Sequence, residues 1–105
     1  MSAADASSAR EIGRRIAAAR RAVGLTQAEL AQRLDWPRDT LIHYEHGRRA
    51  LALHRLVSIA EALAIHPATL LISDEQLAGL VQRLMVDPEL RSQVHFFLTT
   101  LDQPS

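Results

Sequence analysis

The sequence predicts an all-helical protein, and three observations support this prediction. Apolar residues make up 48% of the 105 residues and aromatic residues only 4%, with Ala and Leu abundant. Apolar side chains recur at spacings of three and four residues, which is the period of an α-helix. Gly, Pro, hydroxyl and carboxylate residues stand where these periodic runs begin and end. We therefore expect short helices joined by tight turns.

The first two helices are marked by the residues at their ends. Ser7 or Ser8 is expected to cap the first helix, which runs to about residue 23 before Gly24 ends it. Thr26 opens the second helix, and Glu29 follows it in the capping-box pattern that satisfies two backbone N–H groups. The side chains expected on the buried faces are Ile12, Ile16, Ala19 and Val23, and then Leu30, Ala31 and Leu34.

A third helix is expected after a very short break at residues 35–37. Pro37 cannot continue the preceding helix but is well tolerated at the start of a new one. The third helix is therefore expected to run from Pro37 or Arg38 to His46, where Gly47 ends it. Its inward side chains are Leu41 and Tyr44, and its outward side chains are Arg38, Asp39, Ile42 and His43.

Two more helical segments complete an expected domain of five helices over residues 10–72, preceded by a flexible N-terminus over residues 1–9. The fourth helix is predicted from the spacing of its apolar side chains, and a short fifth helix follows Pro67. The apolar residues in question are Leu53, Leu56, Ile59, Ala60 and Leu63, and then Leu70 and Leu71.

Residues 73–105 are expected to form a C-terminal helical hairpin. Ser73 with Gln76 forms a second capping box, and Asp87 with Pro88 begins the last helix. The two apolar stripes are Leu77, Leu80, Val81 and Leu84, and then Leu90, Val94, Phe97, Leu98 and Leu101. A second copy, the chain's own domain or a protein partner must cover such stripes. We expect them to form the seam of a homodimer.

The net charge of zero conceals a division along the chain. Residues 10–71 contain ten Arg and six acidic residues, whereas residues 72–105 contain two Arg and five acidic residues. The chain contains no Lys, and Arg can form a bidentate contact with phosphate or guanine, although coding bias explains the same preference. The basic part is where an anion would bind, and the hairpin is acidic.

Several other classes of protein receive no support. The absence of cysteine excludes disulfides and thiolate zinc sites. No apolar run suggests a signal peptide or a membrane span, so we expect a cytoplasmic protein with no membrane partner. No Gly-rich phosphate loop, HExxH motif or Cys nucleophile is present, so no enzyme is expected. His43 and His46 lie one turn apart, which is weak evidence for a metal, and neither a metal nor a cofactor is expected.

Residues 12–71 resemble the phage-repressor-like DNA-binding domain, also called the Cro-type or XRE-type helix-turn-helix family. The matching segments are GLTQAELAQRL, TLIHYEHGRR and LVSIAEALAIHPATLL. Three features match the family pattern together: the capped T-Q-x-E-L-A helix, the distance between the two helices and the terminal Y-E-x-G. The resemblance covers a little over half of the chain and implies a protein that binds double-stranded DNA.

The resemblance also implies roles for individual residues. Gln27, at the amino end of the second helix, would bind a backbone phosphate, and Arg48 and Arg49 would meet phosphates after the third helix. Arg20 would pair with Glu45 as a structural link across the domain. The side chains implied to face base edges in the major groove are Arg38, Asp39 and His43.

Some positions depart from the family pattern without breaking the expected fold. Asp35 occupies a turn site where Gly is usual, Pro37 replaces a small hydroxyl cap, and Ala52 lacks the cap expected before the fourth helix. His46 replaces the common Asn before the terminal Gly. Asp39 puts a negative charge on a face that would approach phosphates, which leaves the target sequence open.

Each side chain of the outward face has two interpretations. Arg38 and Asp39 could read neighbouring G and C, or Asp39 could favour the helix dipole and pair with Arg38. Ile42 could pack on a thymine methyl or be a partly covered surface residue. His43 could contact a base or phosphate or be solvated. Thr40 could bind phosphate or sugar, or bond back within its own helix.

Together these observations predict a homodimeric transcriptional regulator, and a repressor in particular, that binds a two-fold symmetric operator. The alternative is an antitoxin-type interaction protein whose hairpin binds a protein partner. Arg14, Arg15 and Arg21 are expected to be solvated, and Trp36 is expected to cover the turn as a partly buried residue.

Overall fold

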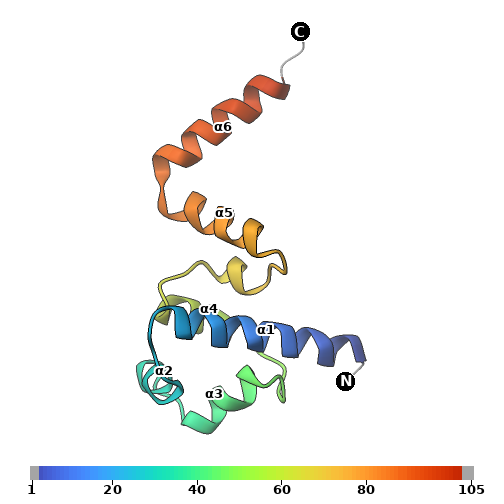
Figure 1. Cartoon of the computed structure of the whole chain (residues 1–105), viewed down its shortest axis with the longest axis vertical. Coiled ribbons are helices and arrows are strands. Elements are labelled where there is room, and N and C mark those ends of the chain that lie inside the picture. Colours follow the sequence, from blue (N-terminus) through green and yellow to red (C-terminus); the bar gives the residue numbers. More distant parts are fainter. Residues whose placement is uncertain (1–2, 103–105) are drawn as a thin grey trace.

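The computed structural model describes the backbone of residues 3–102 and the side chains of residues 8–102. Over this range the chain is helical without a strand, which confirms the all-α prediction. Helices α1 to η1 form the domain in the lower part of Figure 1, and α5 and α6 extend away from it. None of these helices is long and apolar enough to cross a membrane. The elements are α1 (Ala3–Ala22), α2 (Gln27–Leu34), α3 (Arg38–Glu45), α4 (Leu53–Ala62), the 3₁₀ helix η1 (Pro67–Leu70), α5 (Glu75–Val86) and α6 (Pro88–Asp102).

Helix α1 is longer than predicted at its amino end. It begins at Ala3, so the expected start at Ser7 or Ser8 is wrong. Ala has the highest helix propensity, and no residue between Ala3 and Ser8 breaks a helix. Residues 3–9 of the segment expected to be a flexible N-terminus are therefore helical, and residues 1 and 2 lie outside the described part.

The core lies where the first four α-helices and η1 meet. Each element contributes one large aliphatic side chain that is fully buried: Ile16, Leu30, Leu41, Ile59 and Leu70. Burying one such side chain stabilises the fold by about 1.5–3 kcal/mol. The apolar periodicity therefore located the centre of the core correctly.

Three apolar residues at the ends of these elements are not in the core. Val23 is 50% exposed because α1 ends at Ala22, and Leu71 is 51% exposed because η1 is a single 3₁₀ turn that ends before it. Leu53 is 71% exposed at the first position of α4, whose N-cap Ala52 provides no side-chain cap. The spacing of apolar residues in a sequence does not show where the packing of neighbouring elements against a helix ends.

Helix α1 approaches the carboxyl end of α3 at Gly13. A Cβ atom added to Gly13 would overlap the backbone carbonyl oxygens of Tyr44 and Glu45. At Gly47, which has φ +68°, an added Cβ would lie 2.6 Å from the Cα of Arg10. These two glycines let the backbones of α1 and the α3 terminus come together.

The start of α2 has the predicted capping box. The Thr26 hydroxyl accepts from the Glu29 N–H at 3.1 Å, and the Glu29 carboxylate accepts from the Thr26 N–H at 3.0 Å. This donation by the Thr26 N–H, followed by the contribution of its hydroxyl, holds the pKa of Glu29 below its ordinary value. Desolvation opposes the shift and Arg33 adds to it.

Helices α5 and α6 begin at carboxylate caps. Asp74, and not the predicted Ser73, caps α5, because its Oδ1 accepts from the N–H groups of Gln76 and Leu77 at 2.9 and 3.1 Å. Asp87 begins α6 as predicted, with its Oδ1 accepting from the Leu90 N–H at 3.1 Å.

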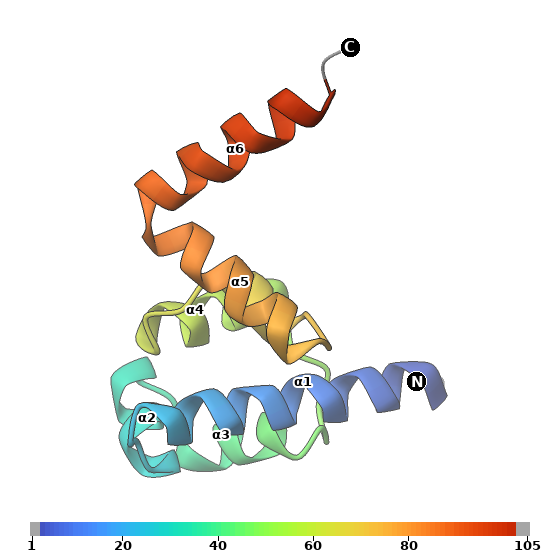
Figure 2. The same cartoon turned by 45° about the horizontal axis from the view of Figure 1, so that its top comes forward.

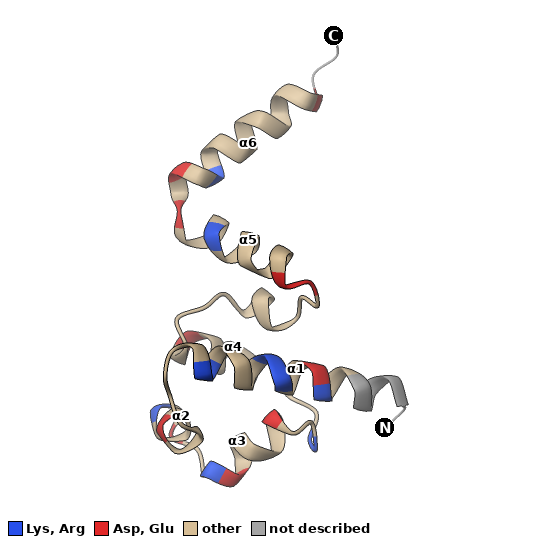
Figure 3. Ribbon diagram, in the orientation of Figure 1, with Lys and Arg blue, Asp and Glu red and all other residues tan. Residues whose placement is uncertain are grey.

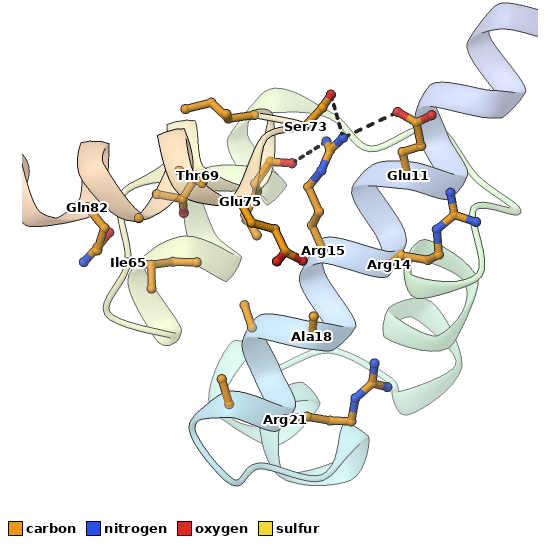
Figure 4. A pocket seen from close by; sticks show the side chains of 16 residues that line it. Glu11, Arg14, Arg15, Ala18, Arg21, Ile65, Thr69, Ser73, Glu75 and Gln82 are labelled. Carbon is orange, nitrogen blue, oxygen red and sulfur yellow. Dashed lines mark hydrogen bonds and ion pairs between the residues drawn. The ribbon is translucent and has the colours of Figure 1, made fainter.

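Side-chain hydrogen bonds attach the segment from η1 to α5 to the rest of the domain. Arg15 of α1 donates to the carbonyl of Leu70 at 3.1 Å and to Ser73 Oγ at 3.2 Å, and it pairs with Glu11 at 3.4 Å (Figure 4). From α5, Gln82 Oε1 accepts from the His66 N–H at 3.0 Å. Arg15 is therefore a structural link, and the expectation that it is merely solvated is wrong.

The C-terminal helices form an open pair in place of a closed hairpin. Figures 1 and 2 show α6 leaving the end of α5 at an angle and pointing away from the domain. None of the described residues of α5 or α6 is fully buried. The expected stripes are half-buried at Val81, Leu84, Leu90 and Val94 and exposed at Leu77, Leu80, Phe97, Leu98 and Leu101.

The close approach at Gly13 predicts opposite effects of the same substitution in two helices. Gly13→Ala forces a methyl group into backbone carbonyls that cannot rotate away, so we expect the free energy of unfolding to fall by about 1–3 kcal/mol. Gly79→Ala in α5 meets open space, so it should be neutral or stabilising by up to about 1 kcal/mol. Thermal unfolding followed by circular dichroism compares the two variants, and equal melting temperatures would contradict the close packing of α1 on α3.

The capping box predicts that the contribution of Glu29 to the stability of the fold depends on pH. Because the folded state lowers the pKa of Glu29 from 4.5, the carboxylate stabilises the fold above that pH and loses this effect as the pH falls through the lowered pKa. The melting temperature of wild type should exceed that of Glu29→Gln near pH 7, and the difference should shrink towards pH 3. Glu61→Gln, at an exposed position of α4, is the control. A difference between wild type and Glu29→Gln that is constant with pH would refute this account.

Candidate nucleic-acid interface

Helix α3 has one buried face and one face that is open to solvent. Leu41, Tyr44 and Glu45 are buried, and α3 packs against α1 and α2. On the opposite side Arg38 and Asp39 are exposed and Ile42 and His43 are half-buried. All four residues predicted to read bases therefore lie together on the accessible side of one short helix.

A buried ion pair fixes α3 to α1. Arg20 Nε donates to Glu45 Oε2 at 2.7 Å, and Arg20 Nη2 donates to Glu45 Oε1 at 3.1 Å. The remaining nitrogen, Nη1, donates to the carbonyl of Leu25 at 2.8 Å in the loop before α2. Arg20 and Glu45, the pair implied by the family resemblance, are 7% and 6% exposed.

Gln27 joins α2 to the same pair. Its Nε2 donates to Glu45 Oε1 at 2.9 Å, so the side chain lies across the start of α2 in a fixed position. In this first turn the N–H groups of Gln27 and Ala28 have no acceptor among the described residues. These two N–H groups can donate to a bound anion, and the positive end of the α2 dipole also favours an anion there.

The turn between α2 and α3 is held by an aromatic and cationic cluster. Asp35 has φ +57°, a left-handed conformation that Asp tolerates better than most residues. Trp36 is half-buried, as expected for a cover over the turn, and meets the Tyr44 ring edge-on with centroids 5.9 Å apart. Arg55 of α4 lies 5.1 Å from the Trp36 ring centroid and donates to the Tyr44 hydroxyl at 2.8 Å. No sequence pattern distinguished Arg55 from the other arginines.

The remaining predicted contact residues lie at the edges of the α3 face. Thr40 is half-buried in α3. In the loop that follows α3, Arg48 and Arg49 are exposed. The Arg49 guanidinium lies 5.6 Å from the Tyr44 ring centroid. Figure 3 shows the Arg and acidic positions adjacent at the start of α3, with further Arg positions along α1.

Hollows border helix α1 on different sides, and two of them are lined by its arginines. The larger, with a volume of about 810 Å³, is a groove between α1 and the η1–α5 segment, and small apolar residues line much of it (Figure 4). The smaller, about 370 Å³, lies where α1 meets the start of α2 and the end of α3. Four arginines of α1 line this smaller hollow: Arg10, Arg14, Arg20 and Arg21. Ala17, Gln27, Glu45 and His46 complete it, and we call it the basic hollow.

Comparison with known proteins agrees with this geometry. A family model described as helix-turn-helix matches residues 16–70, which is just over half of the chain. Among solved structures, the restriction-modification controller protein C.AhdI from Aeromonas hydrophila is 31% identical in sequence and superposes with a TM-score of 0.59. That match covers 61% of this chain and 97% of the controller protein. The search of curated proteins found no match.

The matched residues include both helices of the helix-turn-helix unit, the buried Arg20–Glu45 pair and the whole exposed face of α3. The chain therefore belongs to the XRE-type helix-turn-helix family of DNA-binding transcriptional regulators.

Proposed function

We propose that the protein is a sequence-specific repressor that binds a two-fold symmetric DNA operator as a homodimer. The observation that supports this best is the accessible face of α3, where Arg38, Asp39, Ile42 and His43 share one helix that follows the free N–H groups of the α2 amino terminus. A helix of this kind fits the major groove, and the preceding helix end meets the phosphate backbone. Repression would follow from occupancy of the operator.

The base-reading chemistry begins at the amino end of α3. Arg38 can donate two hydrogen bonds to guanine O6 and N7, and Asp39 can accept one from cytosine N4. Both side chains are exposed and neither forms an ion pair with a described residue. We expect them to read neighbouring base pairs, because the Asp39 carboxylate would be repelled by a base edge that presents only acceptors.

The middle of α3 offers a less polar contact. Ile42 and His43 lie one turn beyond Arg38 and Asp39, and both are half-buried. Ile42 can pack on a thymine methyl group, and His43 can donate to or accept from a base or phosphate. These two side chains would extend the reading along the groove.

Contacts with phosphates would lie on both sides of the exposed face of α3. The first N–H groups of α2, held in place through Gln27, can bind one phosphate. Thr40, Arg48 and Arg49 would bind the backbone on the other side of α3. Such contacts position the protein and make its affinity sensitive to salt, without specifying sequence.

The exposed apolar faces of α5 and α6 support a homodimer. On α6 the residues Leu90, Val94, Phe97, Leu98 and Leu101 share one side, and Phe97 and Leu101 are 60% and 63% exposed. The opposing side contains the polar residues Ser92 and Thr99. Two copies joined through this side could occupy two half-sites and gain the affinity that one short helix lacks.

A second candidate is an interaction protein whose tail, helices α5 and α6, binds a different protein. DNA binding would then serve autoregulation. The observation in its favour is the same exposed face, because a protein partner would cover it as well as a second copy would. The oligomeric state of the chain alone separates the two candidates. The likeness to a restriction-modification controller protein supports a regulatory role under either one.

Arg38→Ala tests base reading. We expect operator binding to weaken by about 1–3 kcal/mol and the preference at one base pair to relax, because the variant cannot form the bidentate hydrogen bonds to guanine. The operator is first selected from a random duplex pool, and all single-base variants are then titrated with both proteins. Arg83→Ala, at an exposed position of α5, should leave the preferences unchanged. Equal weakening on every sequence would mean that Arg38 contacts phosphate instead.

Phe97→Glu tests the dimer seam. A carboxylate in a desolvated apolar seam is costly, so this variant should be monomeric where wild type is dimeric. Phe96→Glu is the matched control, because Phe96 is 72% exposed and lies outside the apolar stripe of α6. Light scattering after size exclusion gives the mass of each. A wild-type chain that stays monomeric at tens of micromolar would favour the protein-partner candidate.

A further inference from the structure

We propose that the basic hollow binds a phosphate of the DNA backbone, so that α1 contributes directly to DNA binding. This inference rests on the proposed function and adds a phosphate site on α1, beside the helix-turn-helix unit. Its central residues are Arg14 and Arg21, for which the sequence predicts only a solvated surface.

The charge balance of the basic hollow favours an anion. Arg20 is already neutralised, because it is bound by both carboxylate oxygens of Glu45. Arg10, Arg14 and Arg21 therefore give the hollow a net charge of three positive units. Among the described residues, no hydrogen bond or ion pair engages the guanidinium of Arg14 or Arg21. An arginine fork that is free can bind phosphate in a bidentate manner.

The spacing of these arginines suits one ligand held from two sides. Arg14 and Arg21 are seven residues apart, which is about 10 Å along the helix axis at 1.5 Å per residue. Gln27 and His46 line the same hollow from the start of α2 and the end of α3. A group entering between the two arginines would therefore touch three segments of the domain at once.

The wall of the basic hollow is rigid and adjoins the proposed DNA path. Gln27 is held by Glu45 at 2.9 Å, and Glu45 is held by Arg20 at 2.7 Å. The same Gln27 residue starts the helix whose N–H groups are proposed to bind a phosphate. A DNA strand that passes this helix end would bring a neighbouring phosphate next to the hollow. The chemical class of the ligand is thus a phosphodiester of the strand already bound.

The larger groove does not compete for these two guanidinium groups. Arg14 and Arg21 also border that groove, but in Figure 4 their side chains extend from α1 on the side away from Gln82 of α5. Within the groove, Arg15 is already engaged by Leu70, Ser73 and Glu11. The free positive charge therefore belongs to the basic hollow.

The test is the salt dependence of DNA binding by the Arg14→Ala/Arg21→Ala double variant. Each neutralised phosphate adds about −0.9 to the slope of log affinity against log salt concentration. For each phosphate that a bound protomer no longer neutralises, we expect this slope to become shallower by about 0.9. The affinity of the double variant for DNA at 0.1 M salt should be weaker by about tenfold or more. The selected base preferences should not change, because phosphate contacts carry no sequence information.

Two control variants sharpen the result. Arg14→Lys/Arg21→Lys keeps both charges and should retain most of the slope, because Lys binds phosphate as a point charge. Arg83→Ala/Arg91→Ala removes two charges from the tail and should leave the slope at the wild-type value. Circular dichroism of each variant checks that the helices are intact.

The outcomes separate this inference from the proposed function. If wild type selects an operator and the double alanine variant has the wild-type slope, the basic hollow is not a phosphate site although the repressor proposal stands. The inference is overturned in the same way if the tail variant changes the slope as much as the α1 variant does. If wild type selects no sequence at any salt concentration, the proposed function fails and this inference fails with it.

Discussion

The buried ion pair between Arg20 and Glu45 is the interaction on which the rest of the DNA-binding domain depends. It links α1, the loop before α2 at Leu25, α2 through Gln27, and α3. A buried pair is favourable only when its remaining hydrogen-bonding groups are satisfied, and no buried side-chain polar atom among the described residues lacks a partner. Removing one member would leave an uncompensated charge at a cost of about 3–5 kcal/mol. The orientation of α3 is therefore set by an ion pair that lies outside its exposed face.

Local signals in the sequence predicted most helix boundaries, whereas contacts between distant residues were missed. The Thr26–Glu29 capping box and Gly47 act within a few residues, so a sequence is sufficient to find them. Gly13, Arg15 and Arg55 act on elements far along the chain, and their roles follow from where those elements pack. A Gly inside a helical pattern was the one available signal, because such a residue usually has a packing reason. The pairing of Arg20 with Glu45 was anticipated only through the family resemblance.

The distribution of charge explains how a chain without net charge can be suited to DNA. Its arginines are concentrated on α1 and around α3, and its tail is acidic (Figure 3). The tail extends on the opposite side of α1 from α3 (Figure 1). A duplex approaching the tail would meet repulsion, and one approaching α3 would meet attraction, so the field orients the encounter.

The attachment of α5 has a geometric consequence for a dimer. Arg15 holds Ser73 just before α5, Gln82 of α5 accepts from the His66 N–H, and α6 starts immediately after α5 at Pro88. In a dimer formed through α6, the separation of the two α3 helices would thus depend on the length of α5. Each added residue would turn α6 by about 100° and move it by about 1.5 Å. Insertions in α5 could therefore change the distance between the two α3 helices of such a dimer while every residue of α3 stayed the same.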